Sequence, residues 1–387
     1  MSGASEHWVS SKPFDPGRTT AELSSVSTAY LDASQRRLFW WRFRRHRLAV
    51  VALGFLALAY LCVVFAEIVA PKGVATRDTQ HIFMPPQRVH LLHEGSFVGP
   101  FVYPFTGRLD MDTLERTYEP DRSKPMPLRF FCRGEPYRFW GLVEADFHLV
   151  CPPDGGTAYF LGTDRLGRDI FSRLVHGARI SLTVGLVGVT LSLILGLMLG
   201  GIAGYRGGWA DYWLQRVTEV LRSLPQLPLW LALSAALPVT MSPILVYFCI
   251  TAILALLEWP GLARAVRSKL LSLREEDFCR AAEMMGASDA RIISRHLLPN
   301  FMSHIIVSAS LAIPTMILAE TALSFLGLGL RAPITSWGVM LSEAQNIEAV
   351  ALYPWLLLPM LPVMLTVLAF SFLGDGLRDA LDPLAAT

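Results

Sequence analysis

Residues able to bind or cleave a phosphate are scarce in this sequence. A phosphate-binding loop of the P-loop kind needs a lysine between glycine and serine or threonine, so that the ammonium group reaches the phosphates. Only four of the 34 basic residues are lysines, and each follows serine or proline: Lys12, Lys72, Lys124 and Lys269. The sequence therefore predicts that any ATP chemistry belongs to another polypeptide.

The remaining candidates for chemistry are isolated ionisable side chains. His90 and His93 lie close together, but two histidines without a third ligand are weak support for a metal site. Glu320 falls in the outer part of an apolar segment, where an ionisable group is usually paired. A hydrogen-bonded structural role therefore competes with substrate contact, which would place Glu320 on a pathway through the protein. Glu67 lies close to the end of the first apolar segment and is expected to be an interfacial residue. We predict neither an enzyme nor a bound cofactor or metal.

Composition places these residues in a membrane protein. Of the 387 residues, 52% are hydrophobic and 17% are charged, and the mean hydropathy is +0.41. A net charge of +2 is too small to indicate a nucleic-acid partner. We expect an all-α integral membrane protein that crosses the lipid bilayer several times.

Six apolar segments have the length needed to cross a bilayer. They cover residues 48–70, 181–205, 212–237, 243–262, 303–328 and 352–373. Pro225 and Pro228 interrupt the third, which suits either the wall of a pathway or a packing kink. The first follows a basic cluster: Arg36, Arg37, Arg42, Arg44, Arg45 and Arg47. This cluster predicts a cytoplasmic N-terminus, and the even number of spans predicts a cytoplasmic C-terminus.

These spans divide the chain into parts. We expect a flexible cytoplasmic tail (1–35), a basic segment with the first transmembrane helix (36–70), an external insert (71–160), an interfacial helix (161–180), a transmembrane domain (181–376) and a cytoplasmic C-terminus (377–387). In the insert, residues 128–131 and 137–140 flank a turn at Gly134 and indicate a small β-rich structure. Thr163 or Asp164 is placed to cap the interfacial helix.

Three glycines in the second span recur at four-residue spacing: Gly196, Gly200 and Gly204. Small residues at this spacing let another helix approach closely, so we expect this face to pack inside the bundle.

The cysteines predict one disulfide, between Cys132 and Cys151. Cys62 and Cys249 fall within predicted spans and Cys279 on the cytoplasmic side, so only this pair shares the external, oxidising side. The alternative is two free thiols, because sequence does not place two Cα atoms within bridging distance. Three aromatic residues in the enclosed loop are the potential core: Phe139, Trp140 and Phe147.

The polar segment 272–300 lies between two apolar blocks and is predicted to form an elbow of two short helices. Ser272 and Glu275 have the spacing of a capping box at its start. Four residues recur at helical spacing on one shallow face suited to a close partner: Phe278, Ala281, Ala282 and Met285. Gly286 is placed to end the first helix in a left-handed turn, Ser288 to cap the second and Pro299 to stop it.

This segment resembles the EAA loop of bacterial ABC-transporter permeases. Five positions agree in identity and spacing: Ala281, Ala282, Gly286, Leu298 and Pro299. Arg280 stands where the motif usually has Glu, and His296 where it usually has Ile. The resemblance implies that the elbow, Glu283 included, is a coupling helix seated in a groove of an ATP-binding subunit. The departure at Arg280 puts in doubt only a salt bridge normally made there. The alternative is an ordinary cytoplasmic loop with two capped helices.

Three further passages resemble the oligopeptide, dipeptide and nickel permease subfamily. They are LGTDRLGRDIFSRLVHGARISL (161–182), the stretch 320–341 with ETALSFLGLG and PITSWGVML, and LGDGLRDALDP (373–383). The resemblance implies six helices of the type I ABC importer kind in the bacterial inner membrane, with this chain as the second of two membrane subunits. The implied partners are a second permease, two ATP-binding subunits and an external substrate-binding protein. Small peptides are the subfamily's commonest cargo, while nickel, a glycoside and a peptide antibiotic stay open.

Two other classes remain as alternatives. A secondary transporter or channel working without ATP would be expected to show paired ionisable residues within spans or an inverted repeat, and we find neither. A membrane-anchored binding or assembly module that uses the insert as its working part is the other.

Overall fold

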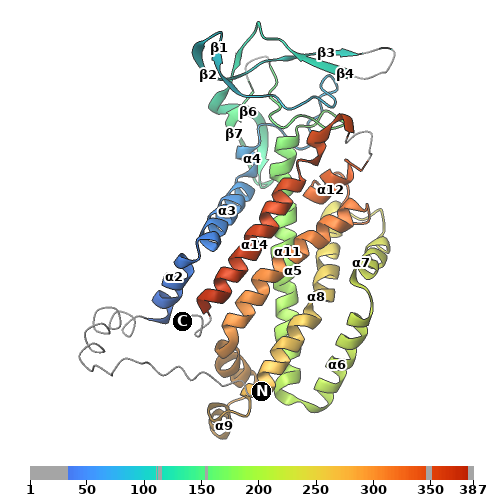
Figure 1. The fold of residues 1–387 in the computed structure, drawn as a ribbon. Coiled ribbons are helices and arrows are strands. Elements are labelled where there is room, and N and C mark those ends of the chain that lie inside the picture. Colours follow the sequence, from blue (N-terminus) through green and yellow to red (C-terminus); the bar gives the residue numbers. More distant parts are fainter. Residues whose placement is uncertain (1–33, 110, 112–115, 153–155, 346–350, 382–387) are drawn as a thin grey trace, which may run out of the picture.

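The computed structural model describes residues 34–109, 111, 116–152, 156–345 and 351–381. A bundle of long helices forms most of the molecule, and a β-rich insert lies at one end of it (Figure 1). Nearly all of the predicted tail, and the end of the predicted C-terminus (382–387), lie outside the described residues.

Five helical stretches in the described part of the chain are long and apolar enough to cross a membrane. They are α3 (Arg47–Val64), α5 (Ile170–Arg206), α8 (Pro243–Leu273), the stretch Asp289–Phe325 that ends in α11 (Met302–Phe325), and the stretch Pro354–Leu381 that ends in α14 (Met360–Leu381). The basic helix α2 (Gln35–Arg45) precedes α3, and α4 (Ala66–Val69) follows it.

The third predicted span (212–237) is not a single helix. It is divided into α6 (Gly208–Ser223) and α7 (Gln226–Ala235). Leu224 between them is extended, with ψ 139°. Pro225 disfavours the helical conformation in the residue before it, which explains the break at this position. Pro228 lies in the first turn of α7, where a proline is tolerated.

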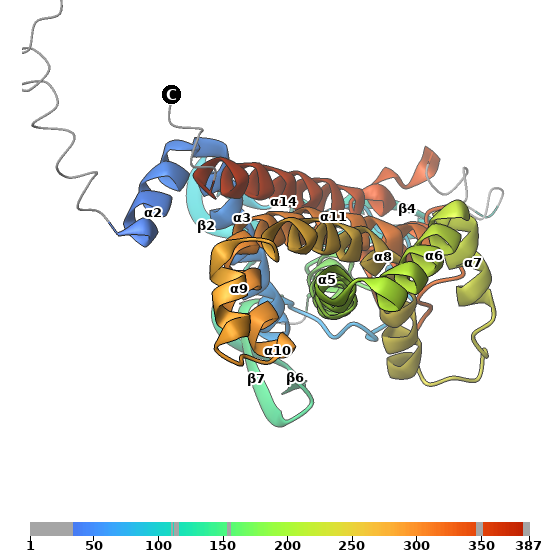
Figure 2. The same cartoon turned by 90° about the horizontal axis from the view of Figure 1, so that it is seen from below.

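Helix α5 lies in the middle of the bundle, with α8 and α11 packed against it (Figure 2). The three spaced glycines lie on its buried face toward α8. A Cβ at Gly200 would be 2.4 Å from the carbonyl oxygen of Ala263, and one at Gly204 would be 2.9 Å from that of Arg267. One at Gly196 would be 2.8 Å from the Leu262 side chain. The two backbones therefore approach closely because these residues have no side chain.

A separate helix over residues 161–180 is not present. Helix α5 begins at Ile170 and continues without a break to Arg206, so the predicted interfacial helix is corrected to a loop followed by the start of α5. Asp169 is its N-cap and accepts a hydrogen bond from the Ser172 N–H at 2.9 Å, so neither Thr163 nor Asp164 caps it. The Asp164 carboxylate instead accepts hydrogen bonds within the preceding loop.

Within its described residues the insert contains seven strands in three small antiparallel sheets. The first sheet consists of β1 (His90–His93), β2 (Ser96–Val102) and β5 (Met126–Pro127). The second pairs β3 (Phe105–Leu109) with β4 (Arg116–Pro120). The third pairs β6 (Arg129–Phe139) with β7 (Val143–Cys151) and forms a long hairpin.

The β6–β7 hairpin differs from the sequence expectation in two ways. Gly134 lies inside β6 and not at a turn, and a Cβ there would be 2.6 Å from the His148 ring, so glycine is needed for close packing. Phe147 and Trp140 are exposed and do not form a core, whereas Phe139 is half-buried. The physical reason is that, in the described part of the insert, β6 and β7 form a sheet of two strands alone, which is too small to enclose a core.

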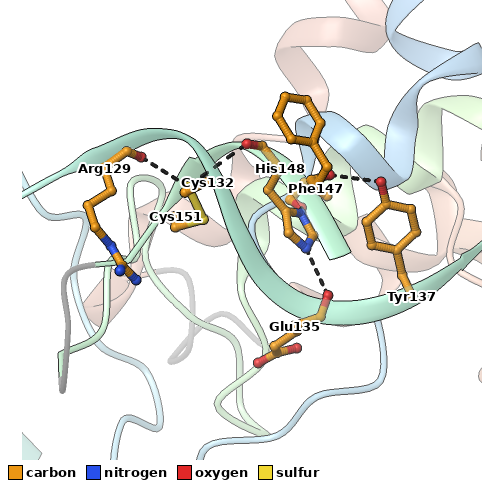
Figure 3. Close-up of a disulfide and its surroundings, with 8 residues drawn as sticks. Arg129, Cys132, Glu135, Tyr137, Phe147, His148 and Cys151 are labelled. Carbon is orange, nitrogen blue, oxygen red and sulfur yellow. Dashed lines mark hydrogen bonds between the residues drawn. A yellow bond between two sulfur atoms is a disulfide. The ribbon is translucent and has the colours of Figure 1, made fainter. Parts of the chain in front are cut away.

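A disulfide joins Cys132 of β6 to Cys151 of β7, with Cα atoms 6.2 Å apart (Figure 3). In the register of the hairpin Cys132 is opposite His148 and Cys151 is opposite Arg129, so the bond crosses the ladder diagonally. The remaining three cysteines are unpaired.

Candidate functional site

The first arm of the elbow is α9 (Asp277–Met284), at the end of the bundle opposite the insert (Figure 1). Glu276 is its N-cap residue and makes no side-chain capping bond. The predicted capping box is wrong, because Ser272 lies inside α8 and Glu275 precedes the new helix. The long helix α8 therefore continues about three turns past the predicted end of its span before the elbow begins.

Arg280, the departure from the EAA-like pattern, points back along the elbow. It donates from Nη2 to Glu275 Oε2 at 2.9 Å. This hydrogen bond, together with one from Arg274, lowers the pKa of Glu275. Both Arg280 and Glu275 are exposed, so solvent screens the pair and it orients the loop more than it stabilises it.

A left-handed glycine ends α9. Gly286 has φ +80°, and its N–H donates to the Glu283 carbonyl at 2.9 Å. The next N–H, of Ala287, donates to the Ala282 carbonyl at 3.1 Å. This pair of bonds is the Schellman motif, which satisfies the last carbonyls of a helix. A Cβ at Gly286 would meet nothing within 4 Å, so glycine is required here for its backbone angle and not for space.

The two faces of α9 differ in burial, and the sequence pattern did not distinguish them. Cys279 and Ala282 are buried against the bundle, whereas Ala281 is exposed. Met284 and Met285 are 84% and 81% exposed at the tip. The expectation that Ala282 shares the outer face is corrected. The exposed apolar residues of α9 and its C-terminal end are Phe278, Ala281, Met284 and Met285.

The second arm of the elbow is joined to a membrane-spanning helix. It begins at α10 (Asp289–Arg291), passes through a π turn (Ile292–Leu297) and a 3₁₀ turn (Leu298–Phe301), and continues into α11. Pro299 therefore does not stop the helix; it lies in the first turn of the 3₁₀ segment, where proline is tolerated. Ser288 is the N-cap residue of α10 but makes no side-chain capping bond.

Buried apolar residues fix both arms to the bundle. The cluster joins Val266 and Leu270 of α8, Cys279 and Ala282 of α9, Ile292 and Leu297 of the second arm, Phe301 just before α11 and Ile305 within it. Arg206 at the end of α5 also contacts Asp289, Nε to Oδ2 at 2.9 Å. His296 and Leu298 are half-buried along the second arm. The elbow is thus attached to α5, α8 and α11 together.

A buried network of four charges lies at the other end of α5. Asp164 accepts from Arg168 Nε at 2.7 Å and from Arg173 Nη1 at 2.5 Å. Both arginines also donate to Glu343, at 2.7 to 3.0 Å. Burial raises the pKa of Glu343, but the hydrogen bonds and charges of Arg173 and Arg168 outweigh it and hold that pKa below its ordinary value. Sequence reasoning missed this network.

Glu320 is fully buried between three elements. Its carboxylate accepts from the hydroxyls of Ser324 and Ser336 at 2.8 Å and of Ser181 at 3.2 Å. Ser336 also caps α12 (Trp337–Ser342), the short helix that follows α11. Of the two roles considered for Glu320, this geometry supports the structural one, because the carboxylate fixes the start of α12 against α5 and α11.

A second intramembrane acid went unnoticed at the level of sequence. Glu258 lies within α8, half-buried, and lines a groove of about 190 Å³ between α5, α8 and α11. Ser192 of α5 and Ser308 of α11 line the same groove. The signal was present in the sequence, because an acid inside an apolar span is a functional-site hypothesis by default.

The histidines considered for metal binding are engaged with aromatic rings. The ring centroids of His90 and Tyr103 are 5.1 Å apart, and those of His93 and Phe101 are 6.0 Å apart. Among the described residues no group of three or more metal-ligating side chains is found.

Comparison with known proteins identifies the family. The model of the "Binding-protein-dependent transport system inner membrane component" family matches residues 196–386, and that of the "N-terminal TM domain of oligopeptide transport permease C" matches residues 34–86. The chain is 46% identical over 226 residues to the dipeptide transport system permease protein DppC of Alkalihalophilus pseudofirmus, covering 58% of this chain and 72% of the relative. The chain belongs to this family of binding-protein-dependent permeases.

Other relatives agree with this assignment. The permease is 39% identical to the oligopeptide transport system permease protein OppC of Bacillus subtilis, over 58% of this chain and 72% of the relative. It is 43% identical to the glutathione transport system permease protein GsiD of Pectobacterium atrosepticum, over 59% and 73%. The permease is therefore an integral membrane subunit of an ABC importer and not the subunit that hydrolyses ATP, which excludes the ATP-independent alternative.

Proposed function

We propose that this permease is one of two membrane subunits of a peptide importer in the bacterial inner membrane. The relatives named above are permeases for dipeptides, oligopeptides and glutathione, all of which contain peptide bonds. The partners in this proposal are a second permease, two ATP-binding subunits and an external binding protein that delivers the peptide.

In this proposal α6 and α7 together make a sixth crossing, interrupted at Leu224. The chain then begins in the cytoplasm, carries its insert and α12 outside, and ends in the cytoplasm. The arginine-rich α2 supports this orientation, because basic residues concentrate on the cytoplasmic side. The position of the elbow supports it too, since α9 lies at the end of the bundle opposite the insert (Figure 1).

The elbow is the proposed docking surface for an ATP-binding subunit. The observation that carries this role is the contrast within α9, where one face is buried in the bundle and the other presents exposed apolar residues at the tip, Met284 and Met285. Methionine side chains are flexible and polarizable and adapt to a partner groove. The identities of Ala281, Ala282, Gly286, Leu298 and Pro299 add the resemblance to the EAA loop.

Coupling then follows from how the elbow is attached. A displacement of α9 acts on α8 and α11, because the first arm follows α8 directly and the second arm continues into α11. Helix α11 carries Glu320, which holds the start of α12 through Ser336. We therefore propose that movement at the cytoplasmic elbow reaches the outer mouth through α11 and exchanges outward-open for inward-open access.

The proposed pathway contact is Glu258. Its carboxylate lies in a groove at mid-span, and one of its neighbours is Gln226 of α7, at 3.5 Å. A carboxylate at this depth complements the ammonium group at the N-terminus of a peptide. Glu258 would thus favour peptides with a free amino terminus.

Reconstitution of the complete importer with its binding protein tests this function. We expect ATP-dependent uptake of tri-alanine, and we expect Glu258→Gln to raise the concentration needed for half-maximal uptake without changing uptake of N-acetyl-tri-alanine. Glu94→Gln, an exposed position in the insert, is the matched control and should behave as the wild type. Uptake of nickel or of a glycoside in place of peptides would overturn the peptide assignment.

A further inference from the structure

The β6–β7 hairpin lies outside both family matches, which cover residues 34–86 and 196–386. Both of its strands contact α4, at the end of the bundle. Figure 2 shows the hairpin projecting sideways beyond the bundle. The His148 ring is held near the base, with Nδ1 2.8 Å from the carbonyl oxygen of Ala70 at the end of α4 and Nε2 2.9 Å from that of Glu135 (Figure 3). The hairpin is therefore fixed in direction.

The tip of the hairpin is fixed at the end of the first membrane-spanning helix. The Trp140 indole N–H donates to the carbonyl of Val64, the last residue of α3, at 3.0 Å. Its backbone N–H donates to Glu67 at 3.3 Å, and the Phe139 ring stacks on Phe65 with centroids 6.2 Å apart. The Arg179 guanidinium lies 4.1 Å from the centroid of the Trp140 ring.

These contacts determine the depth of the tip. Val64 ends the apolar span, and the ion pair of Arg179 with Glu67, at 2.7 Å, lies beside it. Charged groups of this kind, and tryptophan indoles, concentrate where the hydrocarbon of a bilayer meets its headgroups. Trp140 therefore lies at the outer membrane interface.

The residues beyond Trp140 are apolar and exposed. Leu142 is 86% exposed and Val143 is 62% exposed, and they follow Phe139 and Trp140, which contact the exposed residues Phe65 and Val64 at the end of α3. One residue pair further from the tip, Arg138 and Glu144 form an exposed ion pair at 3.0 Å. An apolar tip followed by a charged pair matches the change from acyl chains to headgroups.

We propose that the tip of the β6–β7 hairpin, residues 139–143, inserts into the outer leaflet of the lipid bilayer and holds the insert at the membrane surface. The occupant is lipid because the tip is continuous with the lipid-facing end of α3. This role is independent of the transported substrate, so it stands or fails separately from the proposed peptide import.

Quenching of a site-specific fluorophore tests the proposal. The full-length permease, co-expressed with its partner subunits and with Cys62, Cys249 and Cys279 changed to serine, keeps its external disulfide. A single cysteine at Leu142, or in a second variant at Val143, is labelled with a nitrobenzoxadiazole dye in nanodiscs of phosphatidylcholine and phosphatidylglycerol. The matched control is Phe97, a 75% exposed apolar residue of the β1–β2 hairpin.

We expect phosphatidylcholine with a doxyl group near the headgroup to quench positions 142 and 143 several times more strongly than position 97, and iodide in the buffer to do the reverse. Strong iodide quenching at 142 and 143 would overturn the proposal, because the tip would then be in water. Protection from both quenchers would also overturn it, because protein, such as the second permease, would then cover the tip.

Discussion

Replacing Gly286 with valine tests the coupling role of the elbow at its most constrained backbone position. Gly286 has φ +80°, and no atom within 4 Å would obstruct a side chain, so the substitution acts through backbone strain alone. For residues other than glycine the left-handed conformation costs about 1–2 kcal/mol. That cost corresponds to a change of about 5- to 30-fold in the population of the native turn. The helix that the turn ends has eight residues and is marginal without its cap and its packing.

The assay is ATP hydrolysis by the reconstituted importer, with and without loaded binding protein. We expect Gly286→Val to reach the membrane at near wild-type levels and to lose most of the stimulation by substrate. Gly286→Asn is the matched control, since asparagine tolerates positive φ far better than valine, and it should keep most of the stimulation. Full stimulation in the valine variant, or equal loss in both variants, would refute the reasoning from backbone angle.

Two further perturbations address the end of the molecule that carries the insert. Glu343→Gln removes one of two acids that neutralise Arg168 and Arg173, and breaking such a buried pair should destabilise the permease by about 3 kcal/mol, seen as a lower melting temperature in detergent at pH 7. Because folding lowers the pKa of Glu343 below its ordinary 4.5, the wild-type advantage should be complete above that pH and decrease as pH falls through the lower folded value; an advantage that grows in acid would contradict this sign. Cys132→Ser should make the insert more sensitive to protease, since closing a loop with sequence separation 19 stabilises the folded insert by about 3 kcal/mol in the chain-entropy model. Association with the ATP-binding subunits should be unchanged. Mass spectrometry of a non-reduced tryptic digest should recover the linked Cys132–Cys151 peptides, and full alkylation of both without reduction would count against the bond.

Much of the fold followed from local sequence signals. Apolar length predicted membrane-spanning helices, and the five long helices lie where these signals placed them, with boundaries changed at α5, α8 and α14, which continues to Leu381 past the predicted end of its span at residue 373. The position of Gly286 predicted a left-handed turn, because that conformation depends on a single residue's backbone. The spaced glycines of α5 predicted close helix packing for a similar reason, since the absence of a side chain is a property of the residue itself.

Helix boundaries were less well determined. Ser272 and Glu275 have the spacing of a cap, yet α8 continues through Ser272, because packing of Val266 and Leu270 against the elbow extends the helix. Asp164 looked like a helix cap and is instead an acceptor for two arginines. In each case tertiary contacts outweighed a local preference worth about 1 kcal/mol.

The sequence by itself determined that this is a membrane protein, that it lacks a P-loop, and where its backbone must turn, because hydropathy, motif spacing and glycine conformation act over a few neighbouring residues. Only the tertiary structure decided which residues meet. Glu343 pairs with Arg173 across 170 positions, and Trp140 reaches Val64 across 76. The physical reason is that ion pairs and side-chain packing depend on distance in space, which is set when the helices and the insert come together.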